Sequence, residues 1–509
     1  MAFFPVADFT PDQQNVPPVG SAAIYNVVPR SKLSYGPLAS FQPFSSALAA
    51  RCQGGLSVTA LSGVVRVFAG DAAKLYRLTA ASTTPIDVTR DAGSYTTSPE
   101  DKWSMAIFGN RVIATNYTDE IQSYVEGTST KFANMITSGL TTLKAKVVAV
   151  VKDWVVLGNT NETTSGVQTQ RVHWLAENDP TNAPIPGTQD AVNALSDFQD
   201  IPGSHGVLQN IVSNLGAAHA GIFFERSIQR MVYSGLPAIF EFQPVESGRG
   251  IIAQDAVCAR GGIAYGISEE GFFAFDGASA VPIGKGRIDE FFFKDLIATY
   301  KNRIVSVPDP ISGLIFFAYP GIGSFAGQLN RLLIYSPEYD KFTVTEPGAV
   351  ILEHLLRAAT FGKTLEDLDD FGTMESLAFS LDSPVWKGAQ AVLGGFDSAH
   401  KFGYLNGSNL AATIDTADLE IIKGRVSTVS RIRPLIDVSS ATVSGCGRRT
   451  LSEPASYGSD IAQESDGSVC IRTTGRYHKF RSKIPSEAVW KDFSGVCVED
   501  EDVSDEGSR

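Results

Sequence analysis

The chain has 509 residues, enough for two or three domains with full hydrophobic cores, and 43% of its residues are hydrophobic. This composition excludes a disordered chain. The formal net charge is −13, and no long basic run occurs, which argues against a protein that grips duplex DNA through its phosphates. The 47 Gly and 25 Pro, beside 30 Phe and 15 Tyr, favour many short strands separated by turns.

Cysteine usage and the first residues bear on the compartment. The five cysteines form no C-x-x-C pair and no metal-ligand spacing, which predicts reduced structural thiols. The first five residues lack the basic and long apolar regions of a signal peptide. No stretch approaches the roughly 18 uninterrupted apolar residues of a membrane span. We therefore expect a protein that is assembled in the cytosol and does not span a membrane.

Residues 1–55 are spaced by prolines, which block helices and central strands. Apolar residues remain between the prolines, as in the IYNVV run at 24–28, so the segment is too apolar for a free tail. We predict an extended N-terminal arm, or platform segment, that docks on its own domain or on a neighbour.

From residue 56 the pattern changes to short alternating runs separated by turn residues. Gly109-Asn110 is a strong hairpin signal, and Lys152-Asp153 separates two apolar runs. Hairpins begin near residues 64, 104, 147, 221, 263 and 303, so most are about 40 residues apart, a period typical of propeller blades. We predict a mainly β fold with a β-propeller of about six blades over residues 56–350. The polar stretch near 177–203 is predicted to be an insertion between blades, and a β-sandwich array remains the alternative.

Two further regions complete the predicted domains. Residues 351–395 are predicted to be a connecting segment with short helices at 351–360 and 365–374, because Leu352, Leu355, Leu356 and Ala359 have helical spacing. Residues 396–509 are predicted to be a C-terminal β domain with a solvated, frayed acidic tail. His478 lies in an alternating strand and is predicted to face solvent or an interface.

The sequence lacks the motifs of common catalytic sites, including G-x-S-x-G, H-E-x-x-H and the phosphate loop. Lys285 and its flanking glycines are interpreted as a turn, and the six histidines have no metal-ligand spacing. Asp397, Ser398 and His400 are too close in sequence for a typical triad. We predict no catalytic, cofactor-binding or metal-binding residues, no cofactor and no enzymatic activity.

Several phrases, spread in consistent order over most of the chain, are similar to those of hub or nozzle (tail tubular) proteins of short-tailed bacteriophages. The phrases are FTPD (9–12), NVVPR (26–30), SYGP (34–37), SEEGFFAFDG (268–277), IDEFFF (288–293), NRLLIY (330–335), HKFGY (400–404) and GRYHKFR (475–481). The resemblance implies a structural virion protein of the tail that forms a ring, commonly a homohexamer, below the portal and adaptor. In such rings a propeller lies on the outside of each subunit, and the channel conducts and retains DNA without sequence-specific binding until ejection.

Two other functions stay open at this stage. The first is a virion-attached adhesin or tail-fibre component that binds host glycans, with Trp103, Trp154 and Trp174 as aromatic platforms, although tryptophans in such strands are more often core. The second is a propeller glycosidase, which needs carboxylates from distant segments in one cleft.

Overall fold

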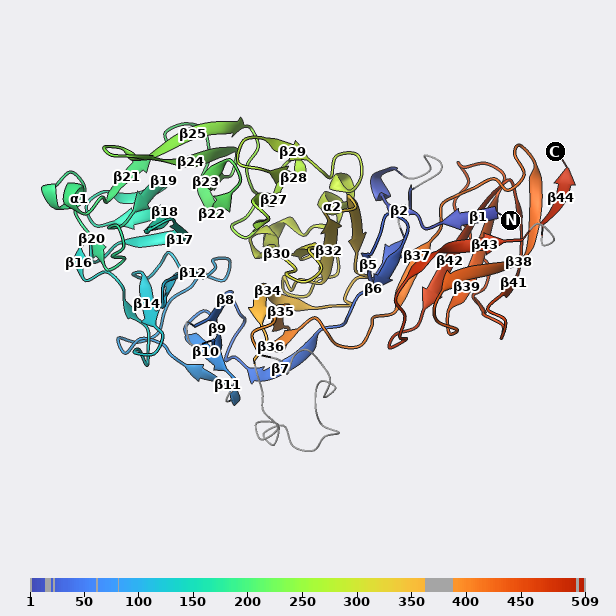
Figure 1. The fold of residues 1–509 in the computed structure, drawn as a ribbon, viewed down its shortest axis with the longest axis horizontal. Coiled ribbons are helices and arrows are strands. Elements are labelled where there is room, and N and C mark those ends of the chain that lie inside the picture. The colour runs from blue at the N-terminus through green and yellow to red at the C-terminus, as the bar shows by residue number, and fades with distance from the viewer. Residues whose placement is uncertain are drawn as a thin grey trace.

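The computed structural model describes residues 2–13, 20–21, 23–60, 63–80, 82–361, 388–499 and 503–507. The protein is mainly β, with 52% of residues in strands and 5% in helices, so the predicted fold class is confirmed at that level. A wide body of sheets lies beside a narrower domain that contains both chain ends (Figure 1). No described helix is long and apolar enough to cross a membrane.

The body, residues 42–404, contains seven antiparallel units of four strands, as the short alternating runs predicted. The first three comprise β8 (Gly54–Thr59), β9 (Val65–Gly70), β10 (Leu75–Thr79) and β11 (Ser82–Asp87); β12 (Ser104–Phe108), β13 (Arg111–Thr115), β14 (Gln122–Val125) and β15 (Ala133–Asn134); and β17 (Lys144–Val151), β18 (Trp154–Glu162), β19 (Gly166–Trp174) and β21 (Asp197–Asp200). The next two comprise β22 (Leu208–Leu215), β23 (Ala218–Phe224), β24 (Ser227–Gly235) and β25 (Ile239–Ser247); and β26 (Val257–Arg260), β27 (Ile263–Ser268), β28 (Gly271–Phe275) and β29 (Ala280–Pro282).

The sixth and seventh units connect the body to the chain ends. The sixth comprises β30 (Val305–Pro308), β31 (Ile315–Tyr319), β32 (Arg331–Ser336) and β33 (Lys341–Val344), and it continues into a nine-stranded sheet. The seventh comprises β34 (Leu352–Ala359), β35 (Ala391–Asp397), β36 (Lys401–Tyr404) and, from the N-terminal segment, β7 (Gln42–Ala47). Helices α2 (Asp289–Asp295) and η2 (Ala298–Arg303) connect the fifth and sixth units.

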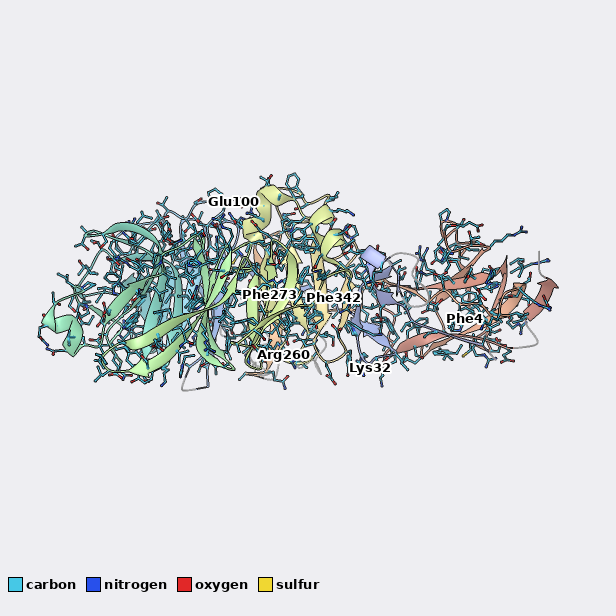
Figure 2. The ribbon with its side chains drawn as sticks, turned by 90° about the horizontal axis from the view of Figure 1, so that it is seen from above. Phe4, Lys32, Glu100, Arg260, Phe273 and Phe342 are labelled. Carbon is cyan, nitrogen blue, oxygen red and sulfur yellow. The ribbon has the colours of Figure 1, made fainter. Side chains whose placement is uncertain are left out.

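The first strand of each unit contacts the first strand of the next. These contacts run from β8 through β12, β17, β22, β26, β30 and β34, and β34 in turn contacts β8. The units therefore follow one another around a common centre (Figure 1). Glu100, which precedes β12, and Arg260, which ends β26, lie on opposite faces of the body (Figure 2).

The predicted helix at 351–360 is wrong, because this segment is strand β34. Every residue of β34 except Arg357 is buried. A strand that is buried on both faces is nearly continuously apolar, so its spacing can resemble that of a helix. The second predicted helix, at 365–374, lies outside the described residues. The boundary expected at 350 lies between the sixth and seventh units, whereas the boundary expected at 396 falls within β35, a central strand of the seventh unit.

The polar stretch near 177–203 lies within a sheet rather than between two sheets. It contains β20 (Asn182–Ala183) and α1 (Gln189–Asn193), and its last part forms β21, the fourth strand of the third unit. β20 pairs in parallel with β16 (Ser138–Gly139). The turn-rich composition of residues 177–203 indicates a long connection. Only the strand pairing shows that this connection joins two strands of the same sheet.

The N-terminal segment lies against its own chain at several places. The strands β1 (Ala2–Pro5), β5 (Val27–Pro29) and β6 (Tyr35–Pro37) join a sheet of the C-terminal region, whereas β2 (Asp8–Phe9) pairs with β3 (Gly20–Ser21). The strand β4 (Ile24–Tyr25) lies between β33 and β37 (Ala412–Asp415) and so connects the body to the C-terminal region. The 3-10 turn η1 (Pro11–Gln13) presents Asp12, whose carboxylate accepts hydrogen bonds from the first amides of α2.

The C-terminal strands and these N-terminal strands together form the terminal domain. One sheet contains β37, β42 (Tyr477–Ile484), β39 (Thr442–Arg448) and β40 (Ile461–Ala462), and the other contains β41 (Val469–Gly475), β38 (Val426–Ile436) and β43 (Phe493–Val498). Buried residues of both sheets pack in one cluster that includes Phe4 and Phe480. The acidic tail was predicted to be frayed, but β44 (Val503–Gly507) pairs with β38 because an open strand edge is available there.

Candidate functional site

A cavity of about 330 Å³ lies at the centre of the body. All seven first strands contribute to its wall, so it lies on the axis that the units share. We call it the axial cavity. Representative lining residues, one from each strand in chain order, are Ser57, Met105, Val148, Ile211, Val257, Ser306 and His354.

A buried ion pair crosses the axis at one end of this cavity. The Lys102 ammonium lies 2.8 Å from the Asp255 carboxylate and donates a 2.6 Å hydrogen bond to the carbonyl of Ile304. These three residues directly precede the first strands of the second, fifth and sixth units. Burial lowers the pKa of Lys102, and the Asp255 carboxylate opposes that shift. The pair ties together segments on opposite sides of the axis.

A second set of polar contacts crosses the same end. The side-chain amide of Gln254 donates to the carbonyl of Lys146 at 3.4 Å, and the amide of Asn210 donates to the carbonyl of Gln254 at 2.5 Å. These contacts connect the third, fourth and fifth units. Together with the Lys102 contacts, they join five of the seven units beside the axial cavity.

Two side chains in the wall have no strong polar partner. His354 is buried, and desolvation lowers its pKa to about 4, so its imidazole is neutral at pH 7. The Ser306 hydroxyl is buried and makes no hydrogen bond within the described part of the chain. No hydrogen bond within the described residues joins Ser306, His354 and Asp255.

His400 and Asp397, which are close in sequence, contact different partners in the structure. The His400 imidazole lies 2.8 Å from the Glu353 carboxylate, which also accepts the amide of Cys52 at 3.0 Å. Asp397 instead accepts hydrogen bonds from backbone amides, including that of Lys401. Burial raises the pKa of Glu353, and His400 opposes this shift.

The three tryptophans considered as sugar platforms are core residues. Trp103 borders the axial cavity but is only 4% exposed, and its indole donates to the carbonyl of Asp71. Trp154 and Trp174 pack against Phe240 in a separate core cluster. These two tryptophans do not line the axial cavity.

The prediction for His478 is wrong. Its side chain is fully buried, and its ring bonds the Ser427 hydroxyl at 3.0 Å. Burial lowers its pKa to about 4. Because alternate residues of a strand share a face, His478 lies on the same side of β42 as Phe480 and Ile484, and this side packs against the other sheet. Lys285 lies in a turn between β29 and α2, as interpreted from the sequence.

Metal chemistry has no support within the described ranges. There, no group of three or more His, Cys, Asp or Glu side chains is placed to hold a metal ion. Sequence reasoning missed the Lys102–Asp255 pair and the axial cavity. Neither has a local signal, because the two residues are 153 positions apart and meet only when the units close around the axis.

Comparisons with known proteins identify no family. No family model and no curated protein matches the chain. Among solved structures, the computationally designed Ika8 protein matches at 10% identity and TM-score 0.35, over 72% of this chain and 99% of that one. The extracellular domain of a protein described as a hybrid two component system of B. thetaiotaomicron matches at 10% identity and TM-score 0.32, over 66% of this chain and 46% of that one. Likenesses this weak support no statement about fold or function.

Proposed function

We propose that the body is a β-propeller with seven blades. The cyclic contacts among the first strands support this architecture, because a propeller arranges four-stranded sheets around a central axis. The seventh unit combines β34 to β36 with β7, so strands from distant parts of the chain close the circle. The sequence predicted about six blades. The seventh unit was missed because its strands come from distant parts of the chain, so they add no further hairpin at the regular spacing.

We propose further that the protein is a structural, non-enzymatic virion component: a subunit of a hub or nozzle ring in a phage tail, which connects the portal and adaptor to the distal tail. One observation carries this proposal. The N-terminal segment is divided among the seventh unit, the β33–β37 junction and the terminal domain. The chain is therefore tied at several places into one elongated building block (Figure 1).

The axial cavity is too small to serve as a path for DNA. Its volume of about 330 Å³ suits a small molecule rather than a duplex. A DNA channel would therefore be formed between subunits, around the axis of a ring. The net charge of −13 supports passage without tight phosphate binding.

The oligomeric state and the position in the virion test this function. We expect closed rings, commonly hexamers, in light scattering and negative-stain microscopy of the full chain with its adaptor, and tail density in cryo-electron microscopy of virions. A species that stays monomeric with adaptor present would refute ring membership. Density for the chain at the virion periphery would also refute it.

A second candidate is an adhesin that binds a host glycan in the axial cavity. It is favoured by the unpartnered Ser306 hydroxyl and the neutral His354 imidazole in the cavity wall. A glycan array tests it. Binding that is lost in Ser306→Val, together with labelling at the virion periphery, would favour the adhesin over the ring.

A further inference from the structure

A second cavity, of about 470 Å³, lies in the terminal domain, outside the axial cavity. Its volume is within the range of small-molecule pockets. The N-terminal segment, the end of β37, the loop after β39 and strand β42 form its wall. The polar lining residues that matter here are Ser21, Asp415, Asp418, Arg448, Lys479 and Arg481.

Asp415 is fully engaged by the protein. It is 2% exposed, and the Arg481 guanidinium donates to both its oxygens, at 2.7 and 3.0 Å. The hydroxyls of Tyr457 and Ser21 donate to it at 2.8 and 3.0 Å. Burial and Asp415 both raise the pKa of Tyr457, so the phenol stays protonated and donates. Asp415 therefore has little capacity for another cation.

Arg448 is also matched by protein groups. Its guanidinium donates to the Asp418 carboxylate and to the carbonyls of Leu451 and Glu453. The side chains of Arg448 and Asp418 are 4% and 10% exposed. This pair is therefore desolvated, and protein groups accept hydrogen bonds from the guanidinium.

Lys479, unlike Asp415 and Arg448, has no close hydrogen-bond partner within the described residues. Its side chain is 9% exposed, and the nearest carboxylate oxygens, on Asp418 and Asp415, lie 3.6 and 3.9 Å from its ammonium. Both distances exceed that of a hydrogen bond. No hydrogen bond from its ammonium occurs within the described residues. Three N–H donors thus reach the cavity wall without a close acceptor.

The buried and half-buried charges of the wall do not balance. Arg448, Lys479 and Arg481 carry three positive charges, and Asp415 and Asp418 carry two negative ones, which leaves one positive charge among these groups. Glu453 also lines the cavity and carries a negative charge, but it is exposed, so water screens its charge more strongly than theirs. Buried charges in proteins are normally paired, so one negative group would complete the site.

We propose that this cavity binds the carboxylate of a small polar molecule, with the Lys479 ammonium as its main hydrogen-bond donor. One carboxylate carries the single negative charge that the wall lacks and offers two acceptor oxygens. The site does not depend on the ring proposal, because it lies within one chain and needs no second subunit.

Calorimetric titration of the full chain with glucuronate, glucose and inorganic phosphate tests the proposal. We expect glucuronate to bind, and glucose to bind at least about tenfold more weakly. Lys479→Met should lower the affinity for glucuronate by about tenfold or more. The matched control is Lys483→Met, two residues along the same strand, where the lysine is 47% exposed and pairs with Asp460. It should leave the affinity within about twofold. Phosphate or glucose binding as tightly as glucuronate would overturn the proposal, as would unchanged affinity in Lys479→Met.

A readout on the unmodified chain covers the case in which Lys479→Met does not fold. Amine acylation followed by mass spectrometry reports each lysine separately. Saturating glucuronate should reduce modification of Lys479 severalfold and leave Lys483 unchanged. Equal modification of Lys479 with and without glucuronate would overturn the assignment.

Discussion

Removing either partner of the Lys102–Asp255 pair should destabilise the protein by unequal amounts. The Lys102 side chain is 7% exposed, whereas that of Asp255 is 27% exposed. Asp255→Asn leaves a buried ammonium with only the Ile304 carbonyl and an amide, and should cost about 3 kcal/mol. Lys102→Met leaves a carboxylate that water can reach, and should cost about 1 kcal/mol. The double variant, which removes both charges, should be more stable than Asp255→Asn alone.

Urea unfolding of the four proteins measures these differences, with the slope of the transition checked for constancy because the chain has more than one domain. Lys131→Met is the matched control, because Lys131 and Asp91 are 2.6 Å apart but 47% and 86% exposed, and it should change stability by less than about 0.5 kcal/mol. Equal losses in the two single variants would refute the reasoning. So would a double variant less stable than Asp255→Asn.

The pH dependence gives an independent check on the same pair. Burial lowers the pKa of Lys102 in the folded chain below its ordinary value of 10.5. At pH values between the folded and unfolded pKa of Lys102, the unfolded chain therefore binds more protons than the folded chain. Stability should therefore rise with pH there. Asp255→Asn removes the group that opposes the shift, so the rise should become larger. An unchanged profile would mean that Lys102 is better hydrated than its burial indicates.

Three further predictions concern other regions. Asp415→Asn weakens four hydrogen bonds, so it should lower the free energy of unfolding by about 3 kcal/mol and speed hydrogen exchange at residues 20–25. The control Asp460→Asn changes an exposed carboxylate and should lower it by less than about 1 kcal/mol. Equal losses would contradict the role of the Asp415 network. His354 and His478 have pKa values of about 4 in the folded chain and 6.5 in the unfolded chain. Stability should therefore be constant above about pH 6.5 and fall toward pH 4 by up to about 1.4 kcal/mol per pH unit for each histidine. Replacing both histidines with Gln should flatten this slope, and a slope that persists would mean that other groups cause it. Pro244→Val in the outer strand β25 should increase self-association in light scattering with little change in unfolding, and no increase would mean that the edge is protected by other means.

Local turn chemistry determined much of the fold from the sequence alone. Gly109-Asn110 joins β12 to β13, and Lys152-Asp153 joins β17 to β18, both as predicted, because a short turn fixes the register of the strands beside it. Proline also marked edges. The outer strands β7, β11, β25 and β29 each contain one, since a missing N–H is tolerated only at an edge. The outer strands β15, β21 and β33 have no proline, and β33 is fully buried because β4 covers it.

Only the tertiary structure decided which distant segments pair. The apolar spacing of residues 352–359 fits a helix or a buried strand, and pairing with β35 selects the strand. No local pattern shows that β7 completes the seventh unit, or that Lys102 meets Asp255 across the axis. Turns are encoded by neighbouring residues, whereas closure, burial and charge pairing depend on contacts between residues far apart in the chain. Many strands and hairpins could therefore be predicted from the sequence, whereas both cavities are formed only when the sheets pack together.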